Sequence, residues 1–171
     1  MELPKRKNTR LKNYDYSTAG AYFITICVHE RRCLLSDIVG ANHDSPENKL
    51  TPCGNVVKEM IEQLPARFGI EISKYIIMPN HIHLIIVIPC DNGRAIHESP
   101  LRYSRSLISK AIGYLKMNSS KKIHQLHYEG KIWQRSFHDH IIRGDEDYGK
   151  IWEYVDTNAM KWEEDCFYEK V

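Results

Sequence analysis

Residues 70–88 read IEISKYIIMPNHIHLIIVI, and this stretch decides the predicted fold. Two apolar runs rich in β-branched residues, 70–78 and 81–88, are separated only by Pro79 and Asn80. Short apolar runs bounded by turn residues are typical of strands, and so short a connection joins antiparallel neighbours. The stretch is therefore predicted to form a tight β-hairpin.

Periodicity outside the hairpin predicts the remaining elements. Apolar and aromatic runs indicate one strand over 22–28 and another over 132–143. Apolar residues at helical spacing predict three helices, over 54–64, 101–117 and 145–161. Pro65 is expected to end the first of them. The order βαββαβ is typical of the α+β ferredoxin-like fold, a split βαβ in which a four-stranded antiparallel sheet carries helices on one face. The C-terminal helix is additional to that fold.

The composition indicates one ordinary globular domain over residues 1–171. Apolar residues make up 42% of the chain and charged residues 27%, and a chain of this length buries about 70% of its unfolded surface without disulfides or a structural metal. The longest apolar run is far shorter than the roughly 20 residues of a transmembrane helix. The five cysteines form no CxxC pair. A membrane protein, a disulfide framework and a thiolate zinc site are therefore not expected.

Charge is unevenly distributed, although 24 Lys and Arg against 22 Asp and Glu give a net charge of only +2. The basic N-terminal arm 1–16 and the basic stretch 101–122 are candidate phosphate-binding surfaces, whereas 144–171 is acidic. The alternative is that each basic run is a solvated face. The segment 36–52 has loop composition and is predicted to be a loop insert. It is either a further segment that contacts the bound partner or an inert loop. The candidate phosphate contacts are Lys5, Arg6, Lys7, Arg10, Arg102, Arg105, Lys110, Lys116, Lys121, Lys122 and Arg135.

Two histidine pairs stand on predicted strands. His81 and His83 are two residues apart, so their side chains project from the same face of a sheet and can reach one metal ion. The alternative is that they form a polar strand edge. His138 and His140 have the same spacing. They are interpreted as support for an active site or as structural hydrogen-bonding groups, and not as a second metal site.

The last predicted helix carries a phenol and an amide on one face. Tyr154 and Asn158 are four residues apart, which makes them neighbours on a helix surface. A phenol can attack a phosphodiester and form a covalent phosphotyrosine when a cation neutralises the phosphate. The alternative is that Tyr154 is a core residue beside Ile151 and Val155, because aromatic residues at helical spacing usually pack inside.

Three segments occur in one order along the chain: MPNHIH at 78–83, IWQRSFHDHIIR at 132–143 and IWEYVDTN at 151–158. Together with RKNTRLKNYDY at 6–16 and GAYFITIC at 20–27, they resemble the single-tyrosine HUH transposases, and among these the REP-associated tyrosine transposases. The resemblance spans nearly the whole chain. It implies a ferredoxin-like HUH endonuclease domain, in agreement with the predicted sheet.

The resemblance also implies a set of site residues. His81 and His83 would bind a divalent metal, Mg²⁺ or Mn²⁺, that polarises the scissile phosphate. Tyr154 matches the family's nucleophile, and Asn158 stands where relatives place a Gln or Asn that completes the metal site. Tyr148 is the reserve nucleophile, although the residue four positions after it is Trp152 and not an amide or an acid. The residue after Asn158 is alanine where the family usually has proline, from which no loss of chemistry is expected.

The implied activity is cleavage of single-stranded DNA next to hairpins through a 5′-phosphotyrosine intermediate, which another 3′-hydroxyl reverses to join strands. A homodimer and a monomer are both compatible with this activity, and no membrane is involved. The expected location is the bacterial cytoplasm, on the nucleoid when DNA is bound. Two other functions stay open: a non-catalytic module that binds single-stranded nucleic acid on its sheet, and a metal-dependent hydrolase that uses water instead of tyrosine.

Overall fold

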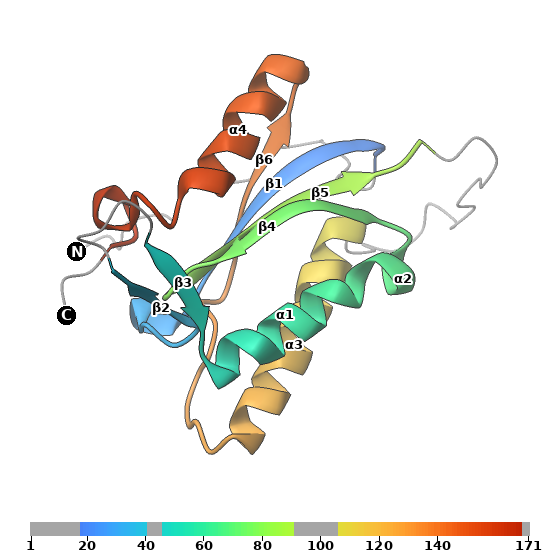
Figure 1. Ribbon diagram of the computed structural model, residues 1–171. Helices are drawn as coiled ribbons and strands as arrows, with labels where there is room; N and C mark the ends of the chain where they lie inside the picture. Colours follow the sequence, from blue (N-terminus) through green and yellow to red (C-terminus); the bar gives the residue numbers. More distant parts are fainter. Residues whose placement is uncertain (1–17, 41–45, 91–105, 169–171) are drawn as a thin grey trace, which may run out of the picture.

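The computed structural model describes residues 18–40, 46–90 and 106–168. Its main sheet has four antiparallel strands in the spatial order β4-β5-β1-β6. These strands are β1 (Gly20–Cys27), β4 (Glu71–Ile77), β5 (His81–Ile88) and β6 (His138–Ile142). The first and last strands along the chain are neighbours, and the hairpin β4–β5 lies beside β1 (Figure 1). This is the split βαβ order, so the predicted ferredoxin-like α+β fold is confirmed.

Helices cover both faces of the sheet (Figure 1). On one face lie α1 (Pro52–Glu62), α2 (Leu64–Phe68) and α3 (Leu107–Gln125). On the other lies α4 (Asp145–Thr157). Short 3-10 turns are η1 (His29–Arg31) and η2 (Trp162–Glu164). Among the helices that the structure describes, none combines the length and the apolar character needed to cross a membrane.

Strand β5 is buried along nearly all of its length on both faces, which explains its almost uninterrupted apolar sequence. Ile82 and Leu84 pack in the larger core, between the sheet and the helices α1 and α3. The alternate residue Ile85 packs with Val155 of α4 in a smaller core on the opposite face. Because strand side chains alternate, His81 and His83 lie on the α4 side of the sheet.

Helix α1 begins and ends differently from the prediction over 54–64. The Thr51 hydroxyl accepts a hydrogen bond from the Gly54 N–H, so the helix starts at Pro52, whose missing N–H is harmless in the first turn. Pro65 does not simply end a helix. It stands in the first turn of α2, which ends at Gly69 with a left-handed φ of 62°.

The third helix is displaced relative to the prediction over 101–117. Its N-cap is Ser106, whose side chain accepts from the Ser109 N–H, and it continues to Gln125. The helix extends beyond residue 117 because its buried stripe continues to Ile123 and keeps it on the sheet. Residues 101–105 lie outside the described part of the chain.

Two further predicted boundaries are wrong. The strand predicted over 132–143 is confined to β6, because Trp133 forms only an isolated bridge with Val28. Trp133 is buried, and its indole N–H donates to the Ser119 hydroxyl at 2.9 Å, so it is a core residue. The helix predicted over 145–161 ends at Thr157, after which the chain turns back toward the sheet.

The segment 36–52 is not a loop insert. It contains a two-stranded antiparallel hairpin, β2 (Ser36–Val39) and β3 (Glu47–Leu50). Ser36 Oγ and Asn48 Nδ2 both donate to the Ile77 carbonyl, at 3.2 and 2.8 Å, and thereby anchor the hairpin to the end of β4. The two strands are short and mostly polar, so their sequence carries no clear strand periodicity.

Gly54 is predicted to be a position where only glycine fits. A Cβ atom there would lie 2.0 Å from the Leu35 carbonyl oxygen, which is backbone and cannot turn away. We expect Gly54→Ala to lower the free energy of unfolding by about 3 kcal/mol, measured by urea denaturation. Gly113→Ala is the matched control, because a Cβ on that α3 residue meets open space and should stabilise the helix by about 1 kcal/mol. Equal midpoints for Gly54→Ala and the wild type would contradict the close approach of α1 to Leu35.

Candidate active site

Two imidazoles converge on the face of β5 that α4 covers. His81 and His83 are 0% and 1% exposed. Their Nε2 atoms lie 3.0 Å apart, and their rings meet nearly edge to face. Strand alternation alone places both on one face, and burial under the C-terminal segment and α4 brings the two nitrogens together. The two predicted histidines therefore form one buried pair, and the alternative that they are a polar strand edge is excluded.

Neighbouring polar groups orient both rings. Asn80 donates its Nδ2–H to the Phe167 carbonyl at 2.8 Å, which leaves Oδ1 to accept from His81 Nδ1–H at 2.9 Å. His81 Nε2 therefore carries a lone pair, and it faces His83 Nε2 at 3.0 Å. His83 Nδ1 lies 2.9 Å from the Thr25 hydroxyl, which can accept its proton in the same way. Such partners fix the tautomer of metal-binding histidines in known sites.

Burial keeps both imidazoles neutral. Desolvation lowers the pKa of His81 from its ordinary value of 6.5 to about 4, although the Asp165 carboxylate opposes the shift. Desolvation, with the neighbouring His81, holds the pKa of His83 well below its ordinary value. Neutral imidazoles are the form that binds metal ions, so both histidines are ready to ligate near pH 7.

These pKa shifts predict acid sensitivity of the metal-free fold. The unfolded chain protonates its histidines near pH 6.5, whereas folded His81 stays neutral down to about pH 4. The unfolded state thus binds more protons in this window, and stability is lost as pH falls through it, by up to about 1.4 kcal/mol per pH unit for one proton. Urea denaturation in chelator between pH 7 and 5 measures this slope. His81→Gln should flatten this slope, and a slope unchanged from the wild type would refute the assignment.

Tyr154 reaches over the histidine pair from α4. Its hydroxyl lies 3.3 Å from His83 Nε2, and its ring meets the Phe23 ring edge-on. The side chain is 40% exposed, whereas Val155 beside it is buried, so the interpretation of Tyr154 as a core residue is wrong. Burial and the Asp165 carboxylate raise the pKa of the hydroxyl, which is therefore protonated at neutral pH.

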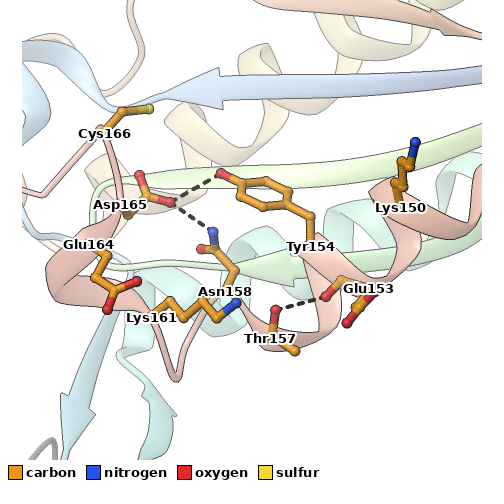
Figure 2. A pocket seen from close by; sticks show the side chains of 9 residues that line it. All are labelled: Lys150, Glu153, Tyr154, Thr157, Asn158, Lys161, Glu164, Asp165 and Cys166. Carbon is orange, nitrogen blue, oxygen red and sulfur yellow. Dashed lines mark hydrogen bonds between the residues drawn. The ribbon is translucent and has the colours of Figure 1, made fainter. Parts of the chain in front are cut away.

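Asp165 joins the site and was not singled out from the sequence. Its Oδ2 accepts hydrogen bonds from the Tyr154 hydroxyl at 3.2 Å and from the Asn158 amide at 2.7 Å (Figure 2). These residues, with Lys150 and Glu153, line a cavity of about 500 Å³. No local pattern identifies Asp165, because it follows the tyrosine helix in a stretch that contains many acidic residues.

Tyr148, the reserve nucleophile, lies elsewhere on the helix. Its hydroxyl shares a hydrogen bond with the Ser73 hydroxyl on the outer strand β4, and its ring packs in the smaller core. The two phenols of α4 therefore reach different partners, Ser73 for Tyr148 and His83 for Tyr154. Of these two tyrosines, Tyr154 is the one hydrogen-bonded to His83.

The second histidine pair lies on the same sheet face but outside the cluster. His138 pairs across the sheet with Thr25, the residue opposite His83, and it is exposed on the edge strand β6. His140 donates to Asp147 Oδ2 at 2.9 Å, and the Arg143 N–H donates to the same oxygen at 2.9 Å. Together these bonds lower the pKa of Asp147, the Arg143 bond more. His140 thus fastens the start of α4 to β6.

The structure places the predicted phosphate contacts in four different situations. Lys116 donates to the carbonyls of Gln134, Arg135 and Ser136, so its ammonium ties α3 to the following loop. Lys122 pairs with Glu59 at 2.8 Å. Lys110, Lys121 and Arg135 are exposed. Those outside the described residues are Lys5, Arg6, Lys7, Arg10, Arg102 and Arg105.

The fold and the histidine pair beneath a helix-borne tyrosine define the single-tyrosine HUH class of nucleic-acid enzymes. The chain belongs to the family described as "Transposase IS200 like", whose model matches residues 16–158. The resemblance found in the sequence is thereby confirmed, and the protein is an enzyme of the transposase class.

Individual proteins are similar to this chain over most of its length. A Haemophilus influenzae protein without an assigned function is 31% identical over 95% of this chain and 93% of its own length. A second protein of that organism, named as a candidate REP-associated tyrosine transposase, is 28% identical over 88% of this chain and 77% of its own. A REP-associated tyrosine transposase solved with a REP hairpin has the same fold, with a TM-score of 0.56 at 19% identity over 90% of this chain and 73% of the other.

Proposed function

We propose that this protein is a metal-dependent endonuclease and strand transferase that cleaves single-stranded DNA next to hairpins through a 5′-phosphotyrosine intermediate. The observation that carries the proposal is the position of the Tyr154 hydroxyl, 3.3 Å from His83 Nε2 and above two converging imidazoles. A nucleophile and a metal-binding pair thus meet at one point, as phosphoryl transfer to a phenol requires.

The residues present fit a divalent metal. His81 and His83 offer two neutral Nε2 donors, oriented by Asn80 and Thr25. A carboxylate oxygen of Asp165 lies within 4.8 Å of a nitrogen of each histidine. Nitrogen and oxygen donors of this kind suit Mn²⁺ and, with substrate phosphate oxygens, Mg²⁺. When bound, the metal supplies polarisation of the scissile phosphate and neutralises charge that develops there. His81, His83 and, from the family resemblance, Asn158 are the residues proposed to hold it.

Tyr154 performs the chemical step in this proposal. Its oxygen forms a bond to phosphorus while the bond from phosphorus to the 3′ oxygen breaks. The phenolic proton that Tyr154 gives up balances the proton gained by the released 3′-hydroxyl. The covalent link keeps the energy of the phosphodiester, so attack by another 3′-hydroxyl rejoins strands without a high-energy cofactor. Tyr154 and His83 come from one chain here, which supports action by a monomer.

Basic side chains are proposed to hold the nucleic acid. Lys110, Lys121 and Arg135 are exposed on the described part of the chain and, with the N-terminal arm, would contact the DNA backbone without reading sequence. A fold relative has been solved with a REP hairpin, which supports hairpin DNA as the ligand of this chain.

The test is formation of a protein–DNA adduct. The protein is incubated with Mn²⁺ and end-labelled single-stranded hairpin DNAs from the flanks of its own gene, then resolved under denaturing conditions. We expect a covalent adduct that keeps the label downstream of the cut, together with a free 3′-hydroxyl on the upstream product. Cleavage without an adduct would indicate a hydrolase that uses water. Tight binding without cleavage, equal in chelator, would indicate a non-catalytic binding module.

A further inference from the structure

An open groove lies on the α3 side of the sheet, between α3 and the loop that follows it. It has a volume of about 470 Å³. One wall is a stripe of α3 that includes Gly113, Met117 and His124, and the other wall is the loop segment 130–135. The cavity beside Tyr154 lies along α4, on the opposite face of the sheet (Figure 1). The groove is therefore a separate surface from the candidate active site.

The groove carries positive charge on both walls. Lys131 and Arg135 are exposed on the loop wall. Lys121 is exposed on α3, four residues after Met117, and therefore lies beside the lining stripe on the helix surface. Of the described residues that line the groove, none is acidic. This charge favours an anionic ligand such as a sugar–phosphate backbone.

Gly113 opens the helix wall to a ligand. It stands inside the 19-residue helix α3, where glycine is less favourable than alanine. Apart from the neighbouring backbone of the helix, the described structure places no atom within 4 Å of the position that a Cβ would take. Packing inside the protein therefore does not require this glycine. Without a side chain, the residue lets a ligand approach the backbone of α3 closely.

The loop wall is fastened to the end of the sheet that carries the histidine pair. The Gln134 N–H donates to the Cys27 carbonyl at 3.0 Å, and Cys27 pairs with His81 across the sheet. The Lys116 ammonium holds the same loop through the carbonyls of 134–136. The loop wall and the histidine pair thus lie at the same end of the sheet, so that one DNA molecule can contact both.

The described lining offers no exposed aromatic ring. Trp133 is the aromatic residue of the lining, and it is buried with its indole N–H bonded to Ser119. Surfaces that bind single strands usually stack unpaired bases on exposed rings. Positive charge without such a ring favours the backbone of a paired stem, whose bases already stack on one another.

We infer that the groove between α3 and residues 130–135 holds the sugar–phosphate backbone of a DNA hairpin stem, while unpaired DNA beside the stem reaches Tyr154. The inference deepens the proposed function and rests on it for DNA as the ligand. Lys121, Lys131 and Arg135 contact phosphates, and the backbone at Gly113 lies against the DNA strand. These contacts position the hairpin without reading its sequence.

The first experiment compares a paired with an unpaired DNA. A hairpin DNA from the flanks of the gene and an unpaired DNA of equal length are bound to the full-length protein in mobility-shift assays at several salt concentrations. We expect Lys131→Ala/Arg135→Ala to weaken hairpin binding at least about tenfold and to lower the slope of log Kd against log salt concentration by about two. Binding of the unpaired DNA should change less. Lys49→Ala/Lys58→Ala is the matched control, because it removes two exposed positive charges from β3 and α1, and it should bind the hairpin as the wild type does.

The second experiment fills the groove without removing charge. Glutamine is a good helix former, and its side chain would enter open space at position 113. The urea denaturation midpoint of Gly113→Gln should therefore not fall below that of the wild type. We expect this variant to lose hairpin binding at protein concentrations that saturate the DNA with the wild type. A stable Gly113→Gln protein that binds the hairpin as tightly as the wild type would overturn the inference.

The outcomes separate this inference from the proposed function. Equal losses for the hairpin and the unpaired DNA in Lys131→Ala/Arg135→Ala would overturn the assignment to a stem. Adduct formation by the wild type, with unchanged hairpin affinity in the groove variants, would overturn the inference and leave the proposed function standing. Hairpin binding that depends on the groove, without any adduct from the wild type, would support the inference and overturn the proposed chemistry.

Discussion

Replacing Tyr154 by phenylalanine is expected to abolish the covalent protein–DNA adduct, since phenylalanine has no oxygen to attack phosphorus. The fold should persist. The hydroxyl makes its bonds to His83 and Asp165 from a side chain that is 40% exposed, and the ring still contacts Phe23. We expect the free energy of unfolding to change by no more than about 1.5 kcal/mol, with hairpin binding in a mobility-shift assay unchanged.

Tyr148→Phe is the matched control for this variant. It removes the same atom from the same helix, but there the hydroxyl bonds to Ser73 on β4 and not to the histidines. Adduct formation by Tyr148→Phe should remain near the wild-type level. If Tyr154→Phe still formed an adduct and Tyr148→Phe did not, the assignment of the nucleophile would be reversed. Cleavage by Tyr154→Phe without an adduct would show that water is the nucleophile.

Removing the metal is expected to have the second largest effect. In EDTA the wild type should lose adduct formation by at least about 10³-fold, because a metal contributes several kcal/mol to stabilising charge on a reacting phosphate, and Mn²⁺ should restore it. His83→Asn should abolish activity that Mn²⁺ does not restore. DNA binding should survive both treatments, since basic side chains and not the metal supply the backbone contacts.

His138→Asn is the control for the histidine substitution. It changes an exposed imidazole on the same sheet face, opposite Thr25 and outside the buried cluster, so cleavage in Mn²⁺ should persist. Equal losses from His138→Asn and His83→Asn would show that both pairs take part in catalysis. Circular dichroism and a denaturation midpoint for each variant establish that the fold is retained, which matters because His83 is 1% exposed.

The local pattern of the sequence predicts those features that depend on neighbours along the chain. Alternation along residues 81–88 places His81 and His83 on one face, and the helical repeat places Tyr154 and Asn158 together. Apolar runs predict the strands of the sheet, because β5 is buried on both sides and must be apolar throughout. The short polar strands β2 and β3 cannot be predicted in this way. Hydrogen bonds to the Ile77 carbonyl, and not an apolar pattern, anchor them to the sheet.

Distant contacts decide the rest of the site. Asp165 reaches the histidines because the chain turns back after α4, and nothing in its own neighbourhood marks it. The sequence predicts Lys116 as a phosphate contact, but its ammonium donates hydrogen bonds to the backbone carbonyls of residues 134–136.

The sequence by itself determined the fold class, because apolar periodicity is a local property. The family and the candidate nucleophile came from the resemblance of the motifs at 78–83, 132–143 and 151–158 to known transposases. The tertiary structure alone decided how the Tyr154 hydroxyl meets the histidines, which ring nitrogens face each other, and that a carboxylate far along the chain lies beside them. Those outcomes depend on how α4 and the segment after it lie against the sheet. Packing between elements sets that geometry, and no short stretch of sequence contains it.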